Sequence, residues 1–320
     1  MKPLAVVTGC AGFIGSNLCD RLLSAGYRVR GIDNFATGQR RFLDRAVTQP
    51  AFELREHDLL DQCGLDEAFV GAETVFHLAA NADVRFGTER PRKDLEQNTI
   101  ATFNVLEAMR RSGCSRIAFS STGSIYGDAT LVPTPEDAPF PVQTSLYGAS
   151  KLACEGLIAA YCEGFGFRSW IFRFVSILGE RYTHGHVFDF CKQLHGDPTT
   201  LRVLGDGSQR KSYLYVQDCI DAILVAIRSA DHRVNIINLG VDGTCRVTDS
   251  IRWICEELGV QPRISYAGGD RGWVGDTPLI HLATDRIRSL GWTPRLSIQQ
   301  GIVQTVRYLQ ANDWVFEERR

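Results

Sequence analysis

A glycine-rich turn near the N-terminus constrains the fold of this chain more than any other segment. Residues 4–8 are short, apolar and rich in β-branched side chains, as in a buried strand, and Gly9 follows them directly. Residues 12–25 then carry the apolar spacing of a helix. Three glycines spaced GxxGxxG between a strand and a helix predict a site for the phosphates of a dinucleotide. We expect Gly9 to allow the sharp turn, Gly12 to let the backbone approach the pyrophosphate, and Gly15 to let the helix pack close to the strand.

Strand patterns alternate with helical patterns through the first half of the chain. Strands are predicted at 28–32, 51–55, 74–78, 116–120 and 169–173, and helices at 61–70, 91–112 and 146–164. Such alternation predicts an α/β fold with a Rossmann-type, doubly wound parallel sheet. Glycine and proline turns come closer together after residue 175. We therefore predict a dinucleotide-binding domain over 1–175 and a smaller, substrate-binding C-terminal lobe over 176–320. The two are interleaved by a segment near 213–240, in which a strand at 234–239 returns to the main sheet.

Composition excludes several classes of partner. The chain has 320 residues and a formal net charge of −2, so electrostatics give no reason to expect nucleic acid or an anionic membrane. No segment approaches the roughly 18 to 20 unbroken apolar residues of a membrane span, and the first residues show no signal-peptide pattern. The ten cysteines contain no CxxC pair, so we expect buried free thiols rather than disulfides or metal ligands. These features predict a cytoplasmic protein without a metal site.

An aspartate indicates which dinucleotide the turn would bind. Asp33 follows the strand predicted at 28–32, where a carboxylate accepts hydrogen bonds from a ribose 2′-OH and repels a 2′-phosphate. This position favours NAD over NADP. Four arginines keep NADP open as an alternative, because a nearby guanidinium would offset the repulsion: Arg28, Arg30, Arg40 and Arg41. Asp58, which follows the strand predicted at 51–55 and precedes Leu59, is a candidate for an adenine contact.

Three further side chains have the character of a catalytic group. Tyr147 and Lys151 open a helical pattern at positions i and i+4, so they share one face of the helix. A tyrosine ordinarily has a pKa of about 10, and it acts as a base near neutral pH only if that pKa is lowered substantially. Lys151 and the positive nicotinamide ring, in a dry site, would supply that lowering. Thr122 lies in a hydroxyl-rich turn at the carboxyl edge of the sheet, where its hydroxyl would bridge a substrate and the phenolate.

Seven features in this order resemble the extended short-chain dehydrogenase/reductase family, in its NAD-dependent nucleotide-sugar epimerase/dehydratase branch. They are TGCAGFIG at 8–15, Asp33, HLAANADV at 77–84, SSTGSIYG at 120–127, YGASK at 147–151, RFVSILG at 173–179 and GDGSQRKSYLYVQD at 205–218. The resemblance covers nearly the whole chain. It implies a tightly held NAD, a catalytic group of Thr122, Tyr147 and Lys151, and a nucleoside diphosphate-sugar bound by the C-terminal lobe.

The same resemblance implies which residues contact the two ligands. The cofactor-binding residues would be Gly9, Gly12, Phe13, Ile14, Gly15, Asp33, Asn34, Gly38, Asp58, Leu59, Leu78, Ala79, Ala80, Asn98, Ser120, Tyr147, Lys151 and Phe174. The substrate-binding residues would be Val84, Thr122, Ser124, Tyr147, Ser176, Val187, Phe188, Lys211 and Arg271. In this family the helices that match 91–112 and 146–164 form a dimeric four-helix interface, so the resemblance also implies a homodimer.

Departures from the family pattern narrow the reaction. Sugar 4,6-dehydratases of this branch carry Thr-Asp-Glu where this chain has Thr122-Gly123-Ser124, so both carboxyl groups needed to eliminate water are missing. Family members usually have asparagine at Ser176 and arginine at Lys211. A lysine keeps the charge but loses the planar fork that binds phosphate bidentately, and Arg210 or Arg271 would have to compensate.

The resemblance is greatest to hexose 4-epimerases that act on UDP-sugars, and it implies oxidation and re-reduction at C4. Several alternatives stay open: an epimerase of another nucleotide sugar (a uronic acid, N-acetylhexosamine or heptose), a net NAD-dependent dehydrogenase or reductase, and a non-catalytic NAD-sensing or scaffold protein on the same fold. The loop with His184 and His186 has no assigned role, and no third ligand at suitable spacing supports a metal there.

Overall fold

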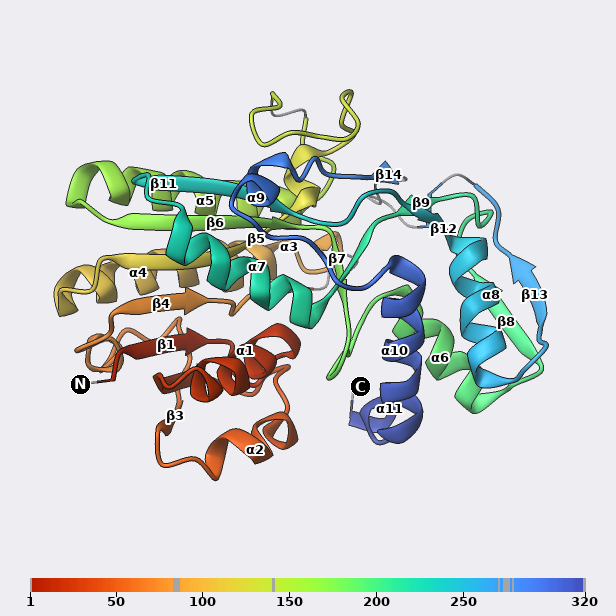
Figure 1. Ribbon diagram of the computed structural model, residues 1–320, viewed down its shortest axis with the longest axis horizontal. Coiled ribbons are helices and arrows are strands. Elements are labelled where there is room, and N and C mark those ends of the chain that lie inside the picture. The colour runs from red at the N-terminus through yellow and green to blue at the C-terminus, as the bar shows by residue number, and fades with distance from the viewer. Residues whose placement is uncertain are drawn as a thin grey trace.

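A seven-stranded parallel sheet forms the centre of the fold, in the order β11-β6-β5-β4-β1-β2-β3 (Figure 1). This computed structural model describes residues 2–82, 87–139, 142–269, 271–272, 277 and 279–318. The strands are β1 (Leu4–Thr8), β2 (Arg28–Asp33), β3 (Phe52–Glu56), β4 (Thr74–His77), β5 (Arg116–Thr122), β6 (Arg168–Phe174) and β11 (Val234–Leu239). From β1 the sheet first extends to β2 and β3, and the chain then adds β4, β5, β6 and β11 on the other side of β1. This order confirms the doubly wound prediction. The carboxyl ends of the strands therefore meet at one edge, where ligands bind in such folds.

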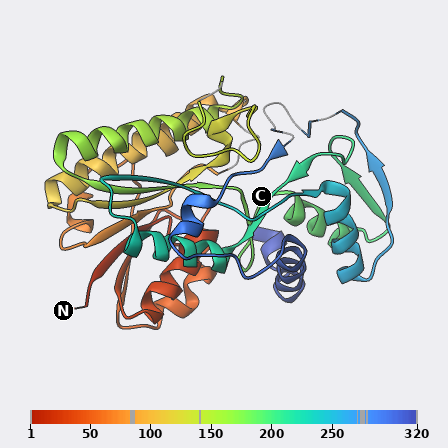
Figure 2. The ribbon, with the colours of Figure 1, turned by 45° about the horizontal axis from the view of Figure 1, so that its top comes forward.

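Helices cover both faces of this sheet, as Figures 1 and 2 show. One face carries α1 (Phe13–Ser24) and α7 (Val216–Ser229), and the other carries α4 (Ala101–Ser112) and α5 (Leu146–Phe165). Because successive strand residues point to opposite faces, Val6 belongs to the core under α4 and α5, whereas Val7 belongs to the core under α1 and α7. Both cores are fully buried, so the sheet is a rigid platform for the edge above it.

Most predicted elements of the first half are present, with one clear error. The helix predicted at 91–112 consists of three consecutive pieces: α3 (Pro91–Asp94), the π-helical turn η4 (Leu95–Ile100) and α4. The helix predicted at 61–70 is wrong, because only the 3-10 turn η2 (Asp66–Ala68) forms there. Gly64 in this segment has a left-handed φ of +72°, which a continuous helix cannot accommodate. Other short pieces are η1 (Arg40–Leu43), α2 (Asp44–Val47) and η5 (Gly123–Tyr126).

A second lobe follows β6 and lies beyond the carboxyl edge of the sheet (Figure 1). It contains β7 (Ser176–Leu178), α6 (His186–Gly196), β8 (Thr200–Val203), β9 (Arg210–Lys211), β10 (Tyr213–Tyr215), β12 (Cys245–Arg246), α8 (Val247–Leu258), β13 (Arg263–Tyr266), β14 (Leu279–Ile280), α10 (Ile298–Ala311) and α11 (Val315–Glu318). The chain leaves this lobe through α7 to form β11, beside β6, and α9 (Asp285–Ser289) packs near β11. The strand predicted at 234–239 is thus present in the main sheet, while the domain boundary at 175/176 stays a prediction.

Membrane-spanning helices are long and uniformly apolar. Among the residues that the structure describes between 2 and 318, no helix is both long and apolar enough to cross a bilayer.

Candidate active site

The glycine turn joins β1 to α1 in a conformation that side chains would disrupt. Gly9 has a φ of +69°, and a Cβ there would lie 2.7 Å from the backbone nitrogen of Ala79. A Cβ on Gly15 would lie 2.0 Å from the carbonyl oxygen of Gly9. Gly12 is the extended N-cap residue of α1. The first N–H groups of a helix have no partner within it, so this end of α1, with Phe13 and Ile14, is suited to bind phosphate.

The Asp33 carboxylate is buried beside this turn and fixed by two backbone donors. Its Oδ2 accepts from the N–H of Ala11 at 2.9 Å, and its Oδ1 accepts from the N–H of Phe35 at 2.8 Å. Burial raises the pKa of Asp33, and these two hydrogen bonds oppose the rise. A Cβ on Gly38 would lie 2.7 Å from Oδ1, so Gly38 leaves space directly over the carboxylate. Such a fixed carboxylate with open space fits the ribose hydroxyls of a dinucleotide.

Three of the four arginines that left NADP open contact other groups. Arg30 donates to Glu53 at 2.8 Å and to the carbonyl oxygen of Ala68 at 3.0 Å. Arg40 pairs with Glu56 and lies 3.8 Å above the centre of the Phe35 ring. Arg41 lies 4.2 Å from the centre of the Trp314 ring, and Arg28 is exposed at the start of β2. Each of these contacts engages a guanidinium with a group other than the Asp33 carboxylate, which favours NAD.

The ends of β2 and β3 bring two further predicted residues together. Asn34 donates from Nδ2 to Oδ2 of Asp58 at 3.1 Å, and Oδ1 of Asp58 accepts from the N–H of Leu60 at 2.9 Å. Leu59, which lies between Asp58 and Leu60 in the chain, is buried. The structure thus places Asn34, Asp58 and Leu59 at the same edge as Asp33.

The end of β4 is fixed by a buried histidine. His77 bonds to the Thr8 hydroxyl through Nδ1 at 2.7 Å and to the Thr102 hydroxyl through Nε2 at 3.0 Å. Burial lowers the pKa of His77 to about 3, so its imidazole is neutral at physiological pH. The same Thr8 hydroxyl accepts from the N–H of Ala79 at 3.3 Å. This bridge places the segment Leu78–Ala80 beside the glycine turn.

The residues predicted to be catalytic come from the end of β5 and the start of α5. Thr122 is the N-cap of η5, and its Oγ1 accepts from the N–H of Ser124 at 3.1 Å. Burial raises the pKa of Tyr147 to about 12, and a hydrogen bond with Thr122 opposes this rise. Lys151 is buried, and its Nζ donates to the carbonyl oxygen of Ser120 at 2.8 Å. Burial lowers the pKa of Lys151 to about 8.

These pKa directions sharpen the prediction made from the sequence. The Lys151 side chain by itself does not bring the pKa of Tyr147 below its ordinary value. Proton acceptance by Tyr147 near neutral pH would therefore need a further positive charge nearby, which the oxidised ring of NAD would supply.

A buried polar network links α5 to the π-helical turn. Asn98 in η4 donates from Nδ2 to the Ser150 hydroxyl at 2.8 Å, and its Oδ1 accepts from the N–H of Asn81 at 2.9 Å. Asn81 donates in turn to Asp94 at 2.7 Å. Single π-turns inside α-helices occur frequently at functional sites. The resemblance identified Asn98, whereas sequence reasoning missed Asn81, Asp94 and Ser150, which only the fold brings together.

Gly123 lies in a tightly packed position. A Cβ there would lie 3.2 Å from Cγ2 of Ile280, 3.2 Å from the carbonyl oxygen of Phe174 and 3.4 Å from Cδ1 of Leu282. The segment that includes β14 therefore packs against the turn after Thr122. A larger residue at position 123 would require these neighbours to shift by a few tenths of an ångström.

The predicted substrate residues of the second lobe differ in accessibility. Ser176 is exposed at the start of β7, and Nζ of Lys211 donates to the carbonyl oxygen of Thr277. Arg271 donates to Asp128 at 2.9 Å. The side chains of Val187 and Phe188 are buried in the core at the start of α6. A substrate contact by those two residues would therefore use their backbone N–H groups rather than their side chains. Val84 lies outside the described residues.

The two unassigned histidines have separate environments. His186 bonds to the Tyr213 hydroxyl through Nδ1 at 2.6 Å and to the Ser250 hydroxyl through Nε2 at 2.9 Å, and burial lowers its pKa to about 3. His184 stacks on Tyr182 with ring centres 6.1 Å apart. In the part of the chain that the structure describes, no three His, Cys, Asp or Glu side chains are grouped to hold a metal ion.

Comparison with known proteins agrees with this geometry. Residues 5–240 match the profile described as the NAD dependent epimerase/dehydratase family. The chain belongs to this family. NAD is therefore its cofactor, and its fold is that of the NAD-dependent epimerases.

Individual relatives extend over the whole chain. UDP-glucose 4-epimerase of Mycolicibacterium smegmatis is 32% identical over 315 residues, covering 95% of this chain and 98% of its own. A crystal structure of UDP-galactose 4-epimerase superposes with a TM-score of 0.87 at 37% identity, covering 97% of this chain and 100% of its own. The Bacillus cereus UDP-glucuronic acid 4-epimerase, in complex with UDP-glucuronic acid and NAD, superposes with a TM-score of 0.89 at 26% identity, covering 96% and 99%.

Replacing Asp33 with Asn tests the NAD preference of this family member. The variant keeps the size of the side chain but loses the charge that accepts from a ribose hydroxyl and repels a 2′-phosphate. We expect NAD affinity to fall about tenfold or more, since a hydrogen bond to a charged group contributes about 1.5–3 kcal/mol, and the preference over NADP to narrow. Calorimetric titration with both dinucleotides measures this. Asp44→Asn, on the exposed helix α2, is the matched control and should bind as the wild type does.

Proposed function

We propose that this protein inverts C4 of a nucleoside diphosphate-sugar, with a UDP-hexose as the preferred substrate. The observation that carries the proposal is the intact Thr122–Tyr147–Lys151 group at the carboxyl edge, followed by Gly123 and Ser124, which carry no carboxylate. This group supports proton transfer at a sugar hydroxyl but offers no described acid pair for eliminating water. The relatives named UDP-glucose 4-epimerase and UDP-galactose 4-epimerase support the same reaction.

The residues divide the chemistry of C4 oxidation between them. Tyr147, once ionised, accepts the proton of the sugar 4-OH, and the Thr122 hydroxyl orients that oxygen. When bound, NAD would supply the reversible hydride acceptor that oxidation and re-reduction at C4 require. Tyr147 then gives its proton back to the C4 oxygen. Lys151, held at the Ser120 carbonyl, keeps a positive charge beside the phenolate while its pKa of about 8 leaves it protonated at neutral pH.

We assign the cofactor contacts by position along the edge. The phosphates would lie at Gly9, Gly12, Phe13, Ile14 and Gly15, the adenosine at Asp33, Asn34, Gly38, Asp58 and Leu59, and the nicotinamide half along Leu78–Ala80, Asn98, Ser120, Tyr147, Lys151 and Phe174. The fixed Asp33 carboxylate and the open space at Gly38 support the adenosine end of this assignment.

The substrate would be held by both lobes, so that the diphosphate stays fixed while the sugar turns. Thr122 and Ser124 would face the sugar, and a contact by Val84, outside the described residues, rests on the family resemblance alone. The backbone N–H groups of Val187 and Phe188 at the start of α6 suit a phosphate, as helix N-termini do. Lys211 and Arg271, together with Ser176, would complete the diphosphate site and replace the grip of the family's usual asparagine and arginine. Binding energy placed there is remote from the reacting carbon.

A panel of nucleotide sugars tests this function. The NAD-loaded protein is incubated with UDP-glucose, UDP-N-acetylglucosamine and UDP-glucuronic acid, and the configuration at C4 is determined by NMR. We expect UDP-glucose and UDP-galactose to interconvert most rapidly. Preferential turnover of UDP-glucuronic acid would favour the substrate of the Bacillus cereus neighbour instead. Accumulation of NADH in proportion to substrate would indicate a net dehydrogenase.

We propose that the protein is a homodimer formed by α4 and α5. The proposal follows the family resemblance, and two exposed aromatic side chains on these helices are available for such an interface: Phe103 on α4 is 43% exposed, and Phe165 at the end of α5 is 54% exposed. We expect light scattering to give the mass of a dimer for the wild type. Phe103→Glu should shift it towards the monomer, because a buried unpaired charge at an interface is costly. Val70→Glu, at an apolar residue outside these helices that is 58% exposed, should leave the dimer intact.

We also propose a cytoplasmic location. All ten cysteines are free, and eight of them are buried, as expected where thiols stay reduced. Fractionation of the source cells with an antibody to the protein would test the location.

A further inference from the structure

A buried ion pair lies behind the catalytic residues. Arg173 on β6 and Glu155 on α5 are 1% and 5% exposed, and Nη2 of Arg173 donates to Oε2 of Glu155 at 2.8 Å. Nε of Arg173 lies 3.2 Å from Oε1 and 3.3 Å from Oε2 of the same carboxylate. A buried pair of this kind is weak evidence for a role in stability, because well-packed apolar residues often stabilise as much or more. Its position therefore calls for another explanation.

The pair joins the elements that carry the catalytic group. Glu155 follows Tyr147 and Lys151 along the same helix, at positions i+8 and i+4. Its Oε1 also accepts a hydrogen bond from the hydroxyl of Ser121, the residue before Thr122. One carboxylate thus connects the middle of α5 to the end of β5, where Lys151 also donates to the Ser120 carbonyl.

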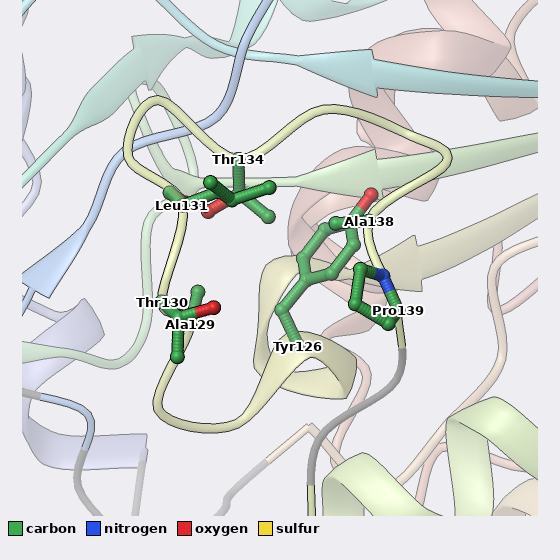
Figure 3. Close-up of a pocket in the computed structure, with 7 residues that line it drawn as sticks. All are labelled: Tyr126, Ala129, Thr130, Leu131, Thr134, Ala138 and Pro139. Atoms are coloured by element: carbon green, nitrogen blue, oxygen red, sulfur yellow. Dashed lines mark hydrogen bonds between the residues drawn. The ribbon is translucent and has the colours of Figure 1, made fainter.

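The other side of the guanidinium is equally fixed. Nη1 of Arg173 donates to the Tyr126 hydroxyl at 2.6 Å and to the carbonyl oxygen of Glu136 at 2.8 Å. The Tyr126 hydroxyl donates to Oδ1 of Asn238 on β11 at 3.0 Å, and Oε1 of Glu136 accepts from the N–H of Asn238 at 2.9 Å. Figure 3 shows the ring of Tyr126 enclosed by the loop that follows it, where it lines a hollow of about 210 Å³. The pair is therefore anchored to β6, β11 and this loop, and it has little freedom to move.

We propose that Glu155 and Arg173 are positioning residues for the reaction, acting through Ser121. Arg173 fixes the carboxylate, and the carboxylate fixes the end of β5 against α5. This sets the position of the Thr122 hydroxyl relative to the Tyr147 hydroxyl. Neither residue touches the substrate or the cofactor in this proposal, which rests on the catalytic role proposed for Tyr147.

The Ser121→Ala variant removes the hydrogen bond from Ser121 to Glu155 while the Arg173–Glu155 ion pair stays intact. Loss of this hydrogen bond would loosen Thr122, whose own hydrogen bond lowers the pKa of Tyr147. We expect kcat at neutral pH to fall about tenfold with KM within about twofold, since small misplacements in a catalytic group reduce rates strongly. The rising limb of the pH profile should move to higher pH. The other groups acting on Tyr147, Asp94 and Cys154, are unchanged in this variant, as is Lys151.

A matched control separates positioning from stability. Ser169, on β6, is buried as Ser121 is, and its hydroxyl bonds to the Cys162 thiol at 3.3 Å, at the far end of the strand from the site. Ser169→Ala should lower the melting temperature to a similar extent as Ser121→Ala and leave kcat and the pH profile as in the wild type. Unchanged kcat and an unchanged pH limb in Ser121→Ala would overturn the proposal, as would equal losses of kcat in both variants.

A second readout does not depend on the identity of the substrate. Ionisation of Tyr147 in the NAD-loaded protein is followed by the ultraviolet absorbance of tyrosinate, with Tyr147→Phe as the background. Ser121→Ala should titrate at higher pH than the wild type, and Ser169→Ala should not. If the wild type epimerises no sugar but this shift is seen, the proposed substrate fails while the positioning role holds. If the wild type is active and the titration of Ser121→Ala matches it, the positioning role fails alone.

Discussion

Tyr147→Phe is expected to lower turnover by about 10²- to 10⁴-fold while NAD stays bound, because general acid–base catalysis contributes rate enhancements of this size. The variant loses only the hydroxyl that exchanges the C4 proton. The contacts of Lys151 with Ser120 and of Thr122 with Ser124 do not depend on that hydroxyl. The wild type should also gain activity as pH rises through the pKa of Tyr147 in the NAD complex. Without the cofactor, burial raises the pKa of Tyr147 to about 12. The pH at which activity rises in the NAD complex therefore shows how far the bound cofactor lowers that pKa.

The same helix offers a control for this variant. Tyr161 also lies on α5, and its hydroxyl donates to Oε1 of Glu107 at 2.7 Å, away from the carboxyl edge. Tyr161→Phe should keep near-normal turnover. The variants are compared by initial rates, by bound NAD in the purified proteins and by melting temperature. Near-normal turnover in Tyr147→Phe would remove Tyr147 from the mechanism.

Gly15→Ala is expected to destabilise the nucleotide-binding end of the sheet by about 3 kcal/mol, the upper part of the usual range for overpacking, and to empty the cofactor site. The new methyl group would lie 2.0 Å from the Gly9 carbonyl oxygen and 2.9 Å from its carbon, and both are backbone atoms that no rotamer change can move. Relief of this clash requires α1 to move away from the turn. Chemical unfolding and the NAD content of the purified protein measure the two effects.

An exposed helical glycine provides the matched substitution. At Gly164 on α5, a Cβ would meet no heavy atom within 4 Å, and the residue has ordinary helical dihedrals. Gly164→Ala should raise stability by up to about 1 kcal/mol, because alanine is the better helix former. Normal NAD content in Gly15→Ala would show that α1 shifts without harm to the phosphate site. That result would contradict the expectation that the cofactor site requires the close approach of α1 to Gly9.

Much of the fold and of the cofactor edge is predictable because the signals are local. The order of strand, glycine turn and helix at 4–25 is confirmed in β1 and α1, and the strand predicted at 234–239 is present as β11. The helix predicted at 61–70 is absent for a local reason as well. Apolar spacing does not report backbone conformation, and Gly64 adopts a left-handed φ that interrupts a helix. The family and its cofactor, predicted from motifs between residues 8 and 218, are likewise confirmed.

What the sequence pattern could not show depends on contacts between distant segments. The closure of Ile280 and Leu282 over Gly123 joins residues more than a hundred positions apart, and no spacing rule predicts it. The Arg173–Glu155–Ser121 network likewise joins β6, α5 and β5. For Val187 and Phe188, the family resemblance implies a substrate contact but does not say which atoms would make it. Because both side chains are buried in the core, such a contact would use the backbone N–H groups.

The central claim is that C4 is oxidised and re-reduced in the same site, with the cofactor retained throughout. UDP-glucose carrying deuterium at C4 tests it most directly, with the label followed by NMR in the UDP-galactose that forms. We predict that the deuterium is kept at C4 of the product, with no exchange into solvent and no net formation of NADH. Loss of the label to water, or its accumulation in released NADH, would contradict the account.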